Sequence, residues 1–239
     1  MYFYPLGDDA LLINFEQKIN REINQEVAKL TSYLRKKKVD GIRYYIPAYC
    51  SLTVGYDPVQ WNFTDLTERI RRFSDKTYRE SLEYNSRFWK IPVCYDPQYA
   101  LDLPALASEK NVSEEQIVTW HLSCKYQVYM LGFLPGFVYL GDLPETLHCQ
   151  RKKQPRMKVP AQSVALAGAQ TGIYPSSAPG GWQIIGKTPL SIFNPENEEP
   201  FLFQMGDQVL FYQVDNTDFL EIATLDLVNL KKLFLSYES

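Results

Sequence analysis

Residues 132–140 read GFLPGFVYL, and residues 154–189 read QPRMKVPAQSVALAGAQTGIYPSSAPGGWQIIGKTP. In both segments glycine and proline separate short apolar runs. Glycine permits a positive φ or a close approach of two backbones, whereas proline fixes φ and removes a backbone donor. The pattern predicts short strands joined by stiff turns, and these turns would present polar and aromatic side chains on one surface.

Strand-like runs continue on both sides of this region. We predict strands at residues 126–131, 137–140, 163–168, 181–186, 190–193 and 207–214. Two helices precede them, one over 102–110 and one that begins with a capping box at Ser113 and ends near Ser123. A helix over 226–237 is predicted to end the chain. The short, evenly spaced strands are typical of a compact β-barrel.

The first 85 residues predict a separate unit. A strand at 10–15 is followed by a helix capped by Asn20, two strands at 42–46 and 51–56, and a second helix. This order favours a small α+β sandwich of ferredoxin-like type, and a strand at 88–95 could serve either this unit or the next. The polar segment 75–86 is the predicted linker, so the domains are predicted at 1–85 and 86–239.

Composition excludes several classes of protein. The 239 residues are 45% hydrophobic, which is enough for a sizeable core, and the net charge of -3 lacks the basic excess that nucleic-acid binding requires. The four cysteines are far apart and form no zinc motif, so we expect reduced thiols and no metal. The chain shows no signal peptide and no apolar run of about 20 residues, which predicts a cytoplasmic protein without a membrane span.

Residues 181–188 satisfy the P-loop pattern G-x-x-x-x-G-K-[ST]. A P-loop wraps phosphate with its backbone and then enters a helix, but the sequence Trp-Gln-Ile-Ile is bulky and favours a strand. We therefore predict that this segment is not a P-loop. Lys187 could still contact an anion as a point charge.

Four motifs in this order, GF-x-PGF-x-YL, PR-x-x-VPA, AGAQTGIYP and APGGWQIIGKTP, resemble the bacterial family of the 5-oxoprolinase B-subunit. That family is also described as allophanate hydrolase subunit 1 and as sporulation kinase inhibitor. The likeness extends more loosely to both ends of the chain. It departs from the family pattern at Gln162 and Ala169, where glycine is expected. The resemblance implies that the second domain is a cyclophilin-like barrel.

Three residues are candidates for catalysis: His121, Arg156 and Lys187. Arg156 and Lys187 could bind an anionic group, and His121 could move a proton near neutral pH. Alternative roles stay open, since Arg156 could form an intramolecular salt bridge and His121 could be a hydrogen-bonded core residue. The resemblance favours the functional role for Arg156.

Six further residues are candidates for substrate binding: Gln170, Thr171, Tyr174, Gly180, Gly181 and Trp182. Gln170 and Thr171 offer donors and acceptors suited to an amide, although they could instead stabilise a turn. Tyr174 and Trp182 could form an aromatic wall for a small ring, although core packing is the rival role.

The resemblance implies a subunit of an ATP-dependent 5-oxoprolinase, inactive alone, that opens the lactam of 5-oxoproline to glutamate. Two partner subunits are implied, one of them also cyclophilin-like, and ATP is used by the complex. One alternative is a regulatory module that inhibits a sensor histidine kinase. Another is a subunit of a hydrolase for allophanate or a urea-type amide. A prolyl isomerase would rest on fold analogy alone.

Overall fold

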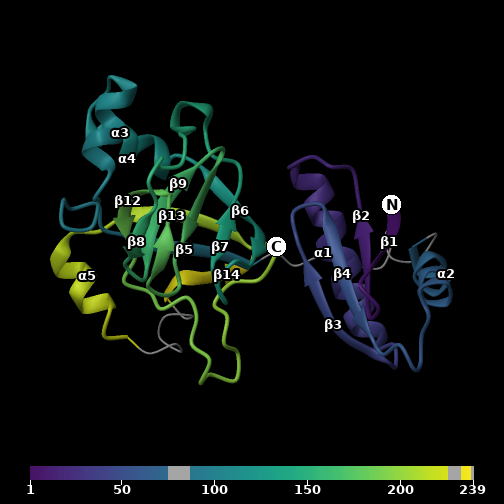
Figure 1. The fold of residues 1–239 in the computed structure, drawn as a ribbon. Helices are drawn as coiled ribbons and strands as arrows, with labels where there is room; N and C mark the ends of the chain where they lie inside the picture. The colour runs from purple at the N-terminus through teal and green to yellow at the C-terminus, as the bar shows by residue number, and fades with distance from the viewer. Residues whose placement is uncertain (75–86, 226–232, 238–239) are drawn as a thin grey trace. The chain divides into compact units, whose positions relative to one another are not determined.

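The fold is described from a computed structural model, which covers residues 1–74, 87–225 and 233–237. The chain forms two compact units, Met1–Asn85 and Ser86–Ser239 (Figure 1). The predicted linker at 75–86 and residues 226–232 of the predicted last helix lie outside the described residues.

The N-terminal unit combines a four-stranded antiparallel sheet with two helices. Its strands follow the order β1-β2-β4-β3. The elements are β1 (Tyr2–Leu6), β2 (Ala10–Asn14), α1 (Arg21–Lys37), β3 (Ile42–Pro47), β4 (Ser51–Tyr56) and α2 (Phe63–Ser74). All of them were predicted except β1, whose Pro5 and exposed tyrosines do not read as a buried strand.

The predicted N-cap of α1 is confirmed, because the Asn20 side chain accepts a hydrogen bond of 3.1 Å from the backbone N–H of Ile23. Alternate residues of β2 and β4 are completely buried, and the helices pack against this sheet. The helix and strand order after β1 is the predicted one. The ferredoxin-like type stays a prediction, because β1 occupies the sheet edge beside β2 and the strand near residue 88 belongs to the other unit.

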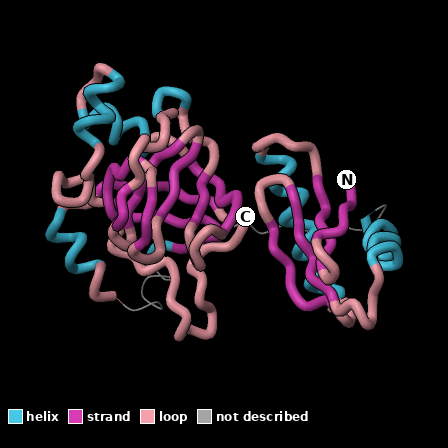
Figure 2. The backbone as a smooth tube through the Cα atoms, viewed as in Figure 1, coloured by secondary structure: helices cyan, strands magenta, loops and turns pink. Residues whose placement is uncertain are grey.

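The C-terminal unit is built on a curled eight-stranded sheet (Figure 2). In sheet order its strands are β12 (Gln183–Lys187), β9 (Ser163–Ala167), β10 (Gln170–Ile173), β7 (Val138–Leu140), β6 (Lys125–Leu131), β13 (Gln208–Gln213), β5 (Arg87–Val93) and β14 (Leu235–Tyr237). The backbones of Cys94, just after β5, and Lys187, at the end of β12, exchange hydrogen bonds of 2.8 and 2.9 Å. The sheet therefore curls until β12 meets the chain beyond β5, as a half-barrel does.

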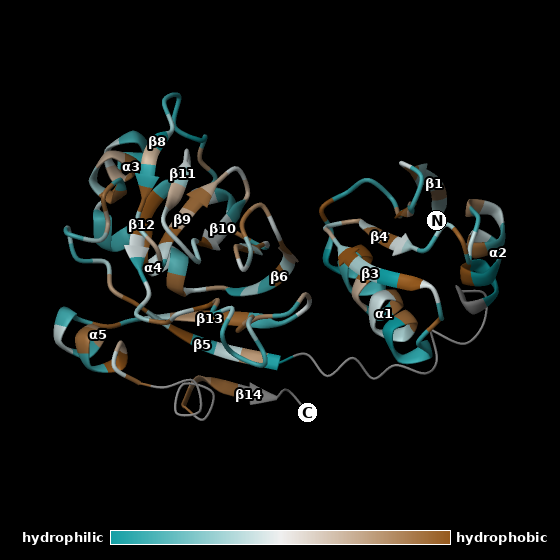
Figure 3. Cartoon of the chain, turned by 60° about the horizontal axis from the view of Figure 1, so that its bottom comes forward, coloured by the Kyte–Doolittle hydropathy of each residue, from teal (hydrophilic) through white to brown (hydrophobic). Residues whose placement is uncertain are grey.

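Helices and a small ribbon complete this unit. They are α3 (Leu103–Lys110), α4 (Glu114–Leu122), the 3-10 turn Glu145–Leu147, α5 (Asn216–Ile222), and the two-stranded ribbon of β8 (Arg156–Val159) and β11 (Ala178–Gly180). Hydrophobic residues run along β9 and β12 (Figure 3). On β9, Val164 and Leu166 join the main core, whereas Ala165 and Ala167 face a second cluster under the ribbon. β9 is thus buried on both of its faces.

Two predicted elements are wrong. Residues 190–193 form no strand, although Phe193 makes an isolated bridge with Phe201. Leu190 and Ile192 are apolar because both are buried in the main core, and not because they pair in a sheet. The end of the predicted last helix is also wrong, since Leu235–Tyr237 is the strand β14 and pairs antiparallel with β5.

Gln162 adopts a φ of +67°, in the left-handed region that favours glycine. Its backbone is fixed on both sides, since its N–H donates to the Tyr174 carbonyl at 2.6 Å and its carbonyl accepts from the Thr188 N–H at 3.0 Å. The chain thus keeps the backbone shape of a glycine with a larger residue. Ala169 does not adopt a positive φ, because Gly168 supplies the positive φ of the turn between β9 and β10.

Replacing Gln162 with glycine is expected to give a protein about 1 kcal/mol more stable than replacing it with alanine. Both variants lose the side-chain amide, but only glycine relieves the left-handed strain. Urea unfolding followed by circular dichroism measures the difference. Equal stabilities would show that the strained φ carries no cost.

Candidate functional site

A buried carboxylate, Asp102, is the centre of a polar network in the C-terminal unit. Arg156 donates to its two oxygens from Nη1 and Nη2, both at 2.7 Å. Lys152 Nζ donates to Oδ1 at 2.8 Å, and the Ile184 backbone N–H donates to Oδ2 at 2.8 Å. We call these residues the Asp102 network. It joins the start of α3 to β8, to β12 and to the segment before the ribbon.

The network holds more positive than negative charge. Arg156 and Lys152 share one carboxylate whose side chain is only 3% exposed. Burial alone would raise the pKa of Asp102, but the hydrogen bonds from Arg156, Lys152 and Ile184 outweigh it and lower that pKa below its ordinary value. Asp102 therefore stays ionised, and one positive charge is left over. Arg156 thus forms the intramolecular salt bridge that the sequence left open as an alternative.

Two predicted glycines lie beside this network. Gly180 pairs with Arg156 across the ribbon, and the Gly181 carbonyl accepts a 2.7 Å hydrogen bond from the Lys152 N–H. A Cβ on Gly180 would stand 2.2 Å from the Tyr174 hydroxyl oxygen, so only glycine fits there without displacing that ring. The structure therefore brings Arg156, Gly180, Gly181 and Tyr174 together.

Tyr174 and Trp182 belong to a buried aromatic cluster that also contains Phe137 and Tyr139. The Phe137 ring meets the Tyr174 ring edge-on at 4.9 Å and the Trp182 ring edge-on at 5.4 Å. Trp182 is 5% exposed, and the guanidinium of Arg151 lies 5.9 Å from its ring centre. Both predicted aromatic residues pack in a core, which was their alternative role. We call these four residues the aromatic cluster.

His121 lies in the core and not on a surface. Its Nδ1 is 2.7 Å from the Tyr95 hydroxyl, and its Nε2 is 3.1 Å from Thr171 Oγ1. Because the Thr171 hydroxyl donates to the Ala165 carbonyl, Nε2–H of His121 donates to Thr171 and Nδ1 accepts from Tyr95. Burial lowers the pKa of His121 to about 3. The prediction that His121 moves a proton is not supported by this position, since both ring nitrogens are occupied and the ring is fully buried.

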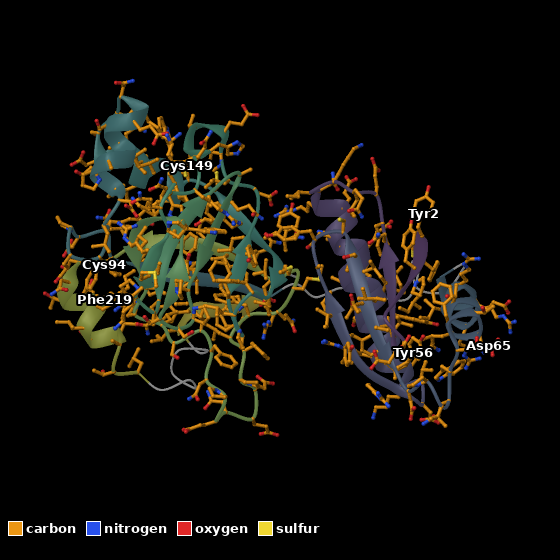
Figure 4. The ribbon with its side chains drawn as sticks, in the orientation of Figure 1. Tyr2, Tyr56, Asp65, Cys94, Cys149 and Phe219 are labelled. Carbon is orange, nitrogen blue, oxygen red and sulfur yellow. The ribbon has the colours of Figure 1, made fainter. Side chains whose placement is uncertain are left out.

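The side chain of Lys187 lies beside aromatic rings and not in the Asp102 network. It lies three residues beyond Ile184 on β12, with its ammonium 5.6 Å from the ring centre of Tyr99 and 5.9 Å from that of Phe219. Those two rings stack at 4.8 Å, and Phe219 of α5 packs with Cys94 (Figure 4). Arg156 and Lys187, which were predicted to bind an anion, therefore contact different sets of residues.

Gln170 and Thr171 point to opposite sides of β10. Thr171 is completely buried beside His121, whereas Gln170 is half-buried and pairs with Ala167. Residues 170, 172 and 174 share one face of the strand, so Gln170 lies on the face of the aromatic cluster. Gln170 and Thr171 cannot hold one amide together.

The sequence did not single out Asp102, Lys152 or Arg151. A signal existed for the two cations, because residues 151–158 contain Arg151, Lys152, Lys153, Arg156 and Lys158. Asp102 lies 54 residues before Arg156 and reads only as a helix start. It makes no side-chain capping bond, because its carboxylate is directed to the cations.

The cysteines show no sign of a nucleophile or a metal site. Burial raises the pKa of the Cys94 and Cys50 thiols, and raises that of Cys149 to about 11. Within residues 1–74, 87–225 and 233–237, no group of His, Cys, Asp and Glu is arranged to hold a metal ion. Among the same residues, no helix has the length and apolarity to cross a membrane. Residues 183–187 form the strand β12, and the residues directly after it are not helical. The segment is therefore not a P-loop.

The chain is a two-unit protein. A small α+β unit is joined to a unit with a curled sheet and a basic ribbon that carries glycines. Residues 1–203 match the family described as carboxyltransferase domain, subdomain C and D. The B-subunit of 5-oxoprolinase from Bacillus subtilis is 39% identical over 228 residues, which cover 90% of this chain and 93% of that protein. The chain belongs to the 5-oxoprolinase B-subunit family.

Longer proteins contain the same fold. The crystal structure of TTHA0988 superposes with a TM-score of 0.77 at 34% identity, over 87% of this chain and 40% of that chain. The chain thus spans less than half the length of that solved relative. A more distant match, 22% identical over 252 residues, is the urea amidolyase of Saccharomyces cerevisiae, of which this chain covers 14%.

Proposed function

We propose that this chain is a subunit of an ATP-dependent 5-oxoprolinase, which hydrolyses the lactam of 5-oxoproline to glutamate together with partner subunits. The Asp102 network is the observation that carries the proposal, because its surplus positive charge suits reactants that are all anions. The extent of the match to the Bacillus subtilis 5-oxoprolinase B-subunit supports it. A cytoplasmic location, a cyclophilin-like C-terminal unit and a ferredoxin-like N-terminal unit belong to the same proposal.

The chemistry explains why ATP is needed. An unstrained lactam is a poor electrophile, and ATP supplies activation by phosphorylating the carbonyl oxygen. The residues of this chain would contribute positive charge, with Arg156 and Lys152 placed to hold an anionic group of the substrate or of ATP. Gln170, at the edge of the aromatic cluster, is the remaining candidate for contact with an amide. We assign proton transfer to a partner protein of the complex, since His121 has both nitrogens occupied.

An incomplete set of catalytic groups argues that the chain is inactive alone. The carboxylate that Arg156 and Lys152 contact, Asp102, is 2% exposed and already paired with both of them, so it is not placed to act as a base. We infer two partner subunits, one of them cyclophilin-like, that complete the site and share the use of ATP. This division of labour agrees with the length of TTHA0988, in which the equivalent segment is only part of one chain.

The test is reconstitution from purified proteins. The chain is mixed with its two partner subunits, and 5-oxoproline-dependent ATP hydrolysis and glutamate release are measured with each protein omitted in turn. We expect turnover only when all three are present. Undiminished turnover without this chain would reject the proposal. Stable association without turnover would direct the same assay to a sensor histidine kinase as target.

A second amide substrate is favoured by one observation. The match to the urea amidolyase covers 93% of this chain, so an acyl-urea such as allophanate is the alternative substrate class. Both substrates carry a carboxylate next to an amide, and the same reconstituted mixture distinguishes them by which one is consumed.

A further inference from the structure

We propose that Lys152 and Arg156 form a binding site for a carboxylate or phosphate group, and that Asp102 is the positioning residue that holds both cations in place. This inference rests on the proposed function, since it names the group of the substrate or of ATP that the chain would bind. Asp102 itself does not touch the ligand. Its role is to fix the direction of the two cationic side chains.

The cations keep unused hydrogen-bond donors. A guanidinium has five N–H donors and an ammonium has three. Arg156 gives one from Nη1 and one from Nη2 to Asp102, and Lys152 gives one. None of their other side-chain donors meets a partner within the described residues. The side chains of Arg156 and Lys152 are 26% and 29% exposed, so both cationic side chains reach the surface of the unit.

The backbone beside the cations is held by two glycines, and further cations lie in the same segment. Gly180 pairs with Arg156 across the ribbon, and the Gly181 carbonyl accepts from the Lys152 N–H at 2.7 Å, so both glycines hold the backbone that carries the cations. A Cβ on Gly181 would be in ordinary van der Waals contact with the Lys152 carbonyl and with Pro155, both at 3.6 Å, so this glycine packs closely against the segment that carries the two cations. Lys153 and Lys158 are exposed in the same segment and add positive potential around it.

A second Arg–Asp pair in the same unit shows what a purely structural pair looks like. Arg87 binds Asp207 at 3.0 and 2.6 Å and also donates to the Leu202 carbonyl at 3.1 Å. Asp207 is completely buried and also accepts from Trp89 Nε1 and the Gln204 N–H. One cation meets one carboxylate there, and no charge is left over. The Asp102 network differs by its second cation, which gives the surplus that a ligand anion would neutralise.

Titration calorimetry tests the site with two probes, 5-oxoproline and inorganic phosphate. Each is titrated into the full chain and into the assembled enzyme. The wild-type protein is expected to bind one of them, and the one that binds identifies a carboxylate or a phosphate as the ligand group. Lys152→Met keeps the Asp102–Arg156 pair but removes the surplus charge, and is expected to weaken binding at least about tenfold, because a charge-assisted bond is lost.

Asp102→Asn tests positioning. It is expected to raise KM for the bound ligand at least about tenfold in the assembled enzyme while kcat changes much less, because the cations remain but lose their fixed direction. Asp207→Asn is the matched control, and is expected to lower stability while leaving affinity and KM unchanged.

Unchanged affinity in both Lys152→Met and Asp102→Asn would overturn the site, as would the absence of binding by either probe to the wild-type chain and assembly. If the wild-type complex turns over 5-oxoproline and both variants keep its affinity and KM, the site is rejected and the proposed function is kept. Ligand binding that depends on Lys152, without turnover in the reconstituted mixture, would support the site and reject the proposed function.

Discussion

Replacing Trp182 with alanine is expected to lower the free energy of unfolding by about 3–5 kcal/mol. The indole is 5% exposed and meets the rings of Phe137 and Tyr139 at 5.4 and 5.8 Å. Its removal leaves a cavity between the sheet and the ribbon, which cannot collapse because Gly180 and Tyr174 are already in contact. Urea unfolding followed by far-ultraviolet circular dichroism measures the change.

Trp182→Phe is the control for this prediction. A phenyl ring keeps an edge-on contact with Phe137 and fills most of the space, so the loss is expected to be less than half of that for alanine. A loss below about 1 kcal/mol for Trp182→Ala would contradict the buried role and restore Trp182 as a surface residue available to a substrate.

Lowering the pH from 7 to 5 is expected to remove about 2 kcal/mol of stability through His121 alone. The ordinary pKa of 6.5 applies in the unfolded chain, and burial lowers it to about 3 in the folded chain. Between these values the unfolded chain binds one more proton than the folded chain does. Stability therefore falls as the pH drops below 6.5, by about 1.4 kcal/mol for each unit, until the pH nears 3.

His121→Gln isolates this effect. A glutamine amide can donate to Thr171 and does not titrate, and the second histidine, His148, is present in both proteins. Urea unfolding of both proteins at pH 7, 6 and 5 should show stabilities that converge as the pH falls. Parallel pH profiles would mean that His121 is not buried as a neutral group.

Much of the fold could be predicted because the strands buried on both faces need continuous apolar runs. Residues 163–168 have such a run and contain β9, which is buried along its whole length, whereas 126–131 and 207–214 mix apolar and polar residues and contain β6 and β13. Residues 190–193 look the same in sequence, yet they fill the core without pairing. Periodicity cannot separate burial from pairing. It also missed β1, where Pro5 and partly exposed tyrosines suggest an irregular segment.

Less of the candidate site could be predicted. Arg156, Gly180, Gly181, Tyr174 and Trp182 were singled out from one segment, and the structure brings them to one region. Asp102 could not be found in this way, because its partner lies 54 residues later and only folding joins them. For His121 the sequence left two roles open for a similar reason. A histidine on a helix gives no sequence signal of whether its ring meets solvent or a core.

The position of β5 between β13 and β14 affects how the chain can fold during synthesis. Arg87 on β5 and its partner Asp207 are 120 residues apart, and β5 pairs in parallel with β13. During synthesis β5 must wait for most of the remaining chain before it acquires its neighbours, and such long-range pairing is slow. The edge of β5 has no pairing partner throughout that interval, and an unpaired strand edge makes a folding intermediate prone to aggregation. All strands of the N-terminal sheet are already translated by then.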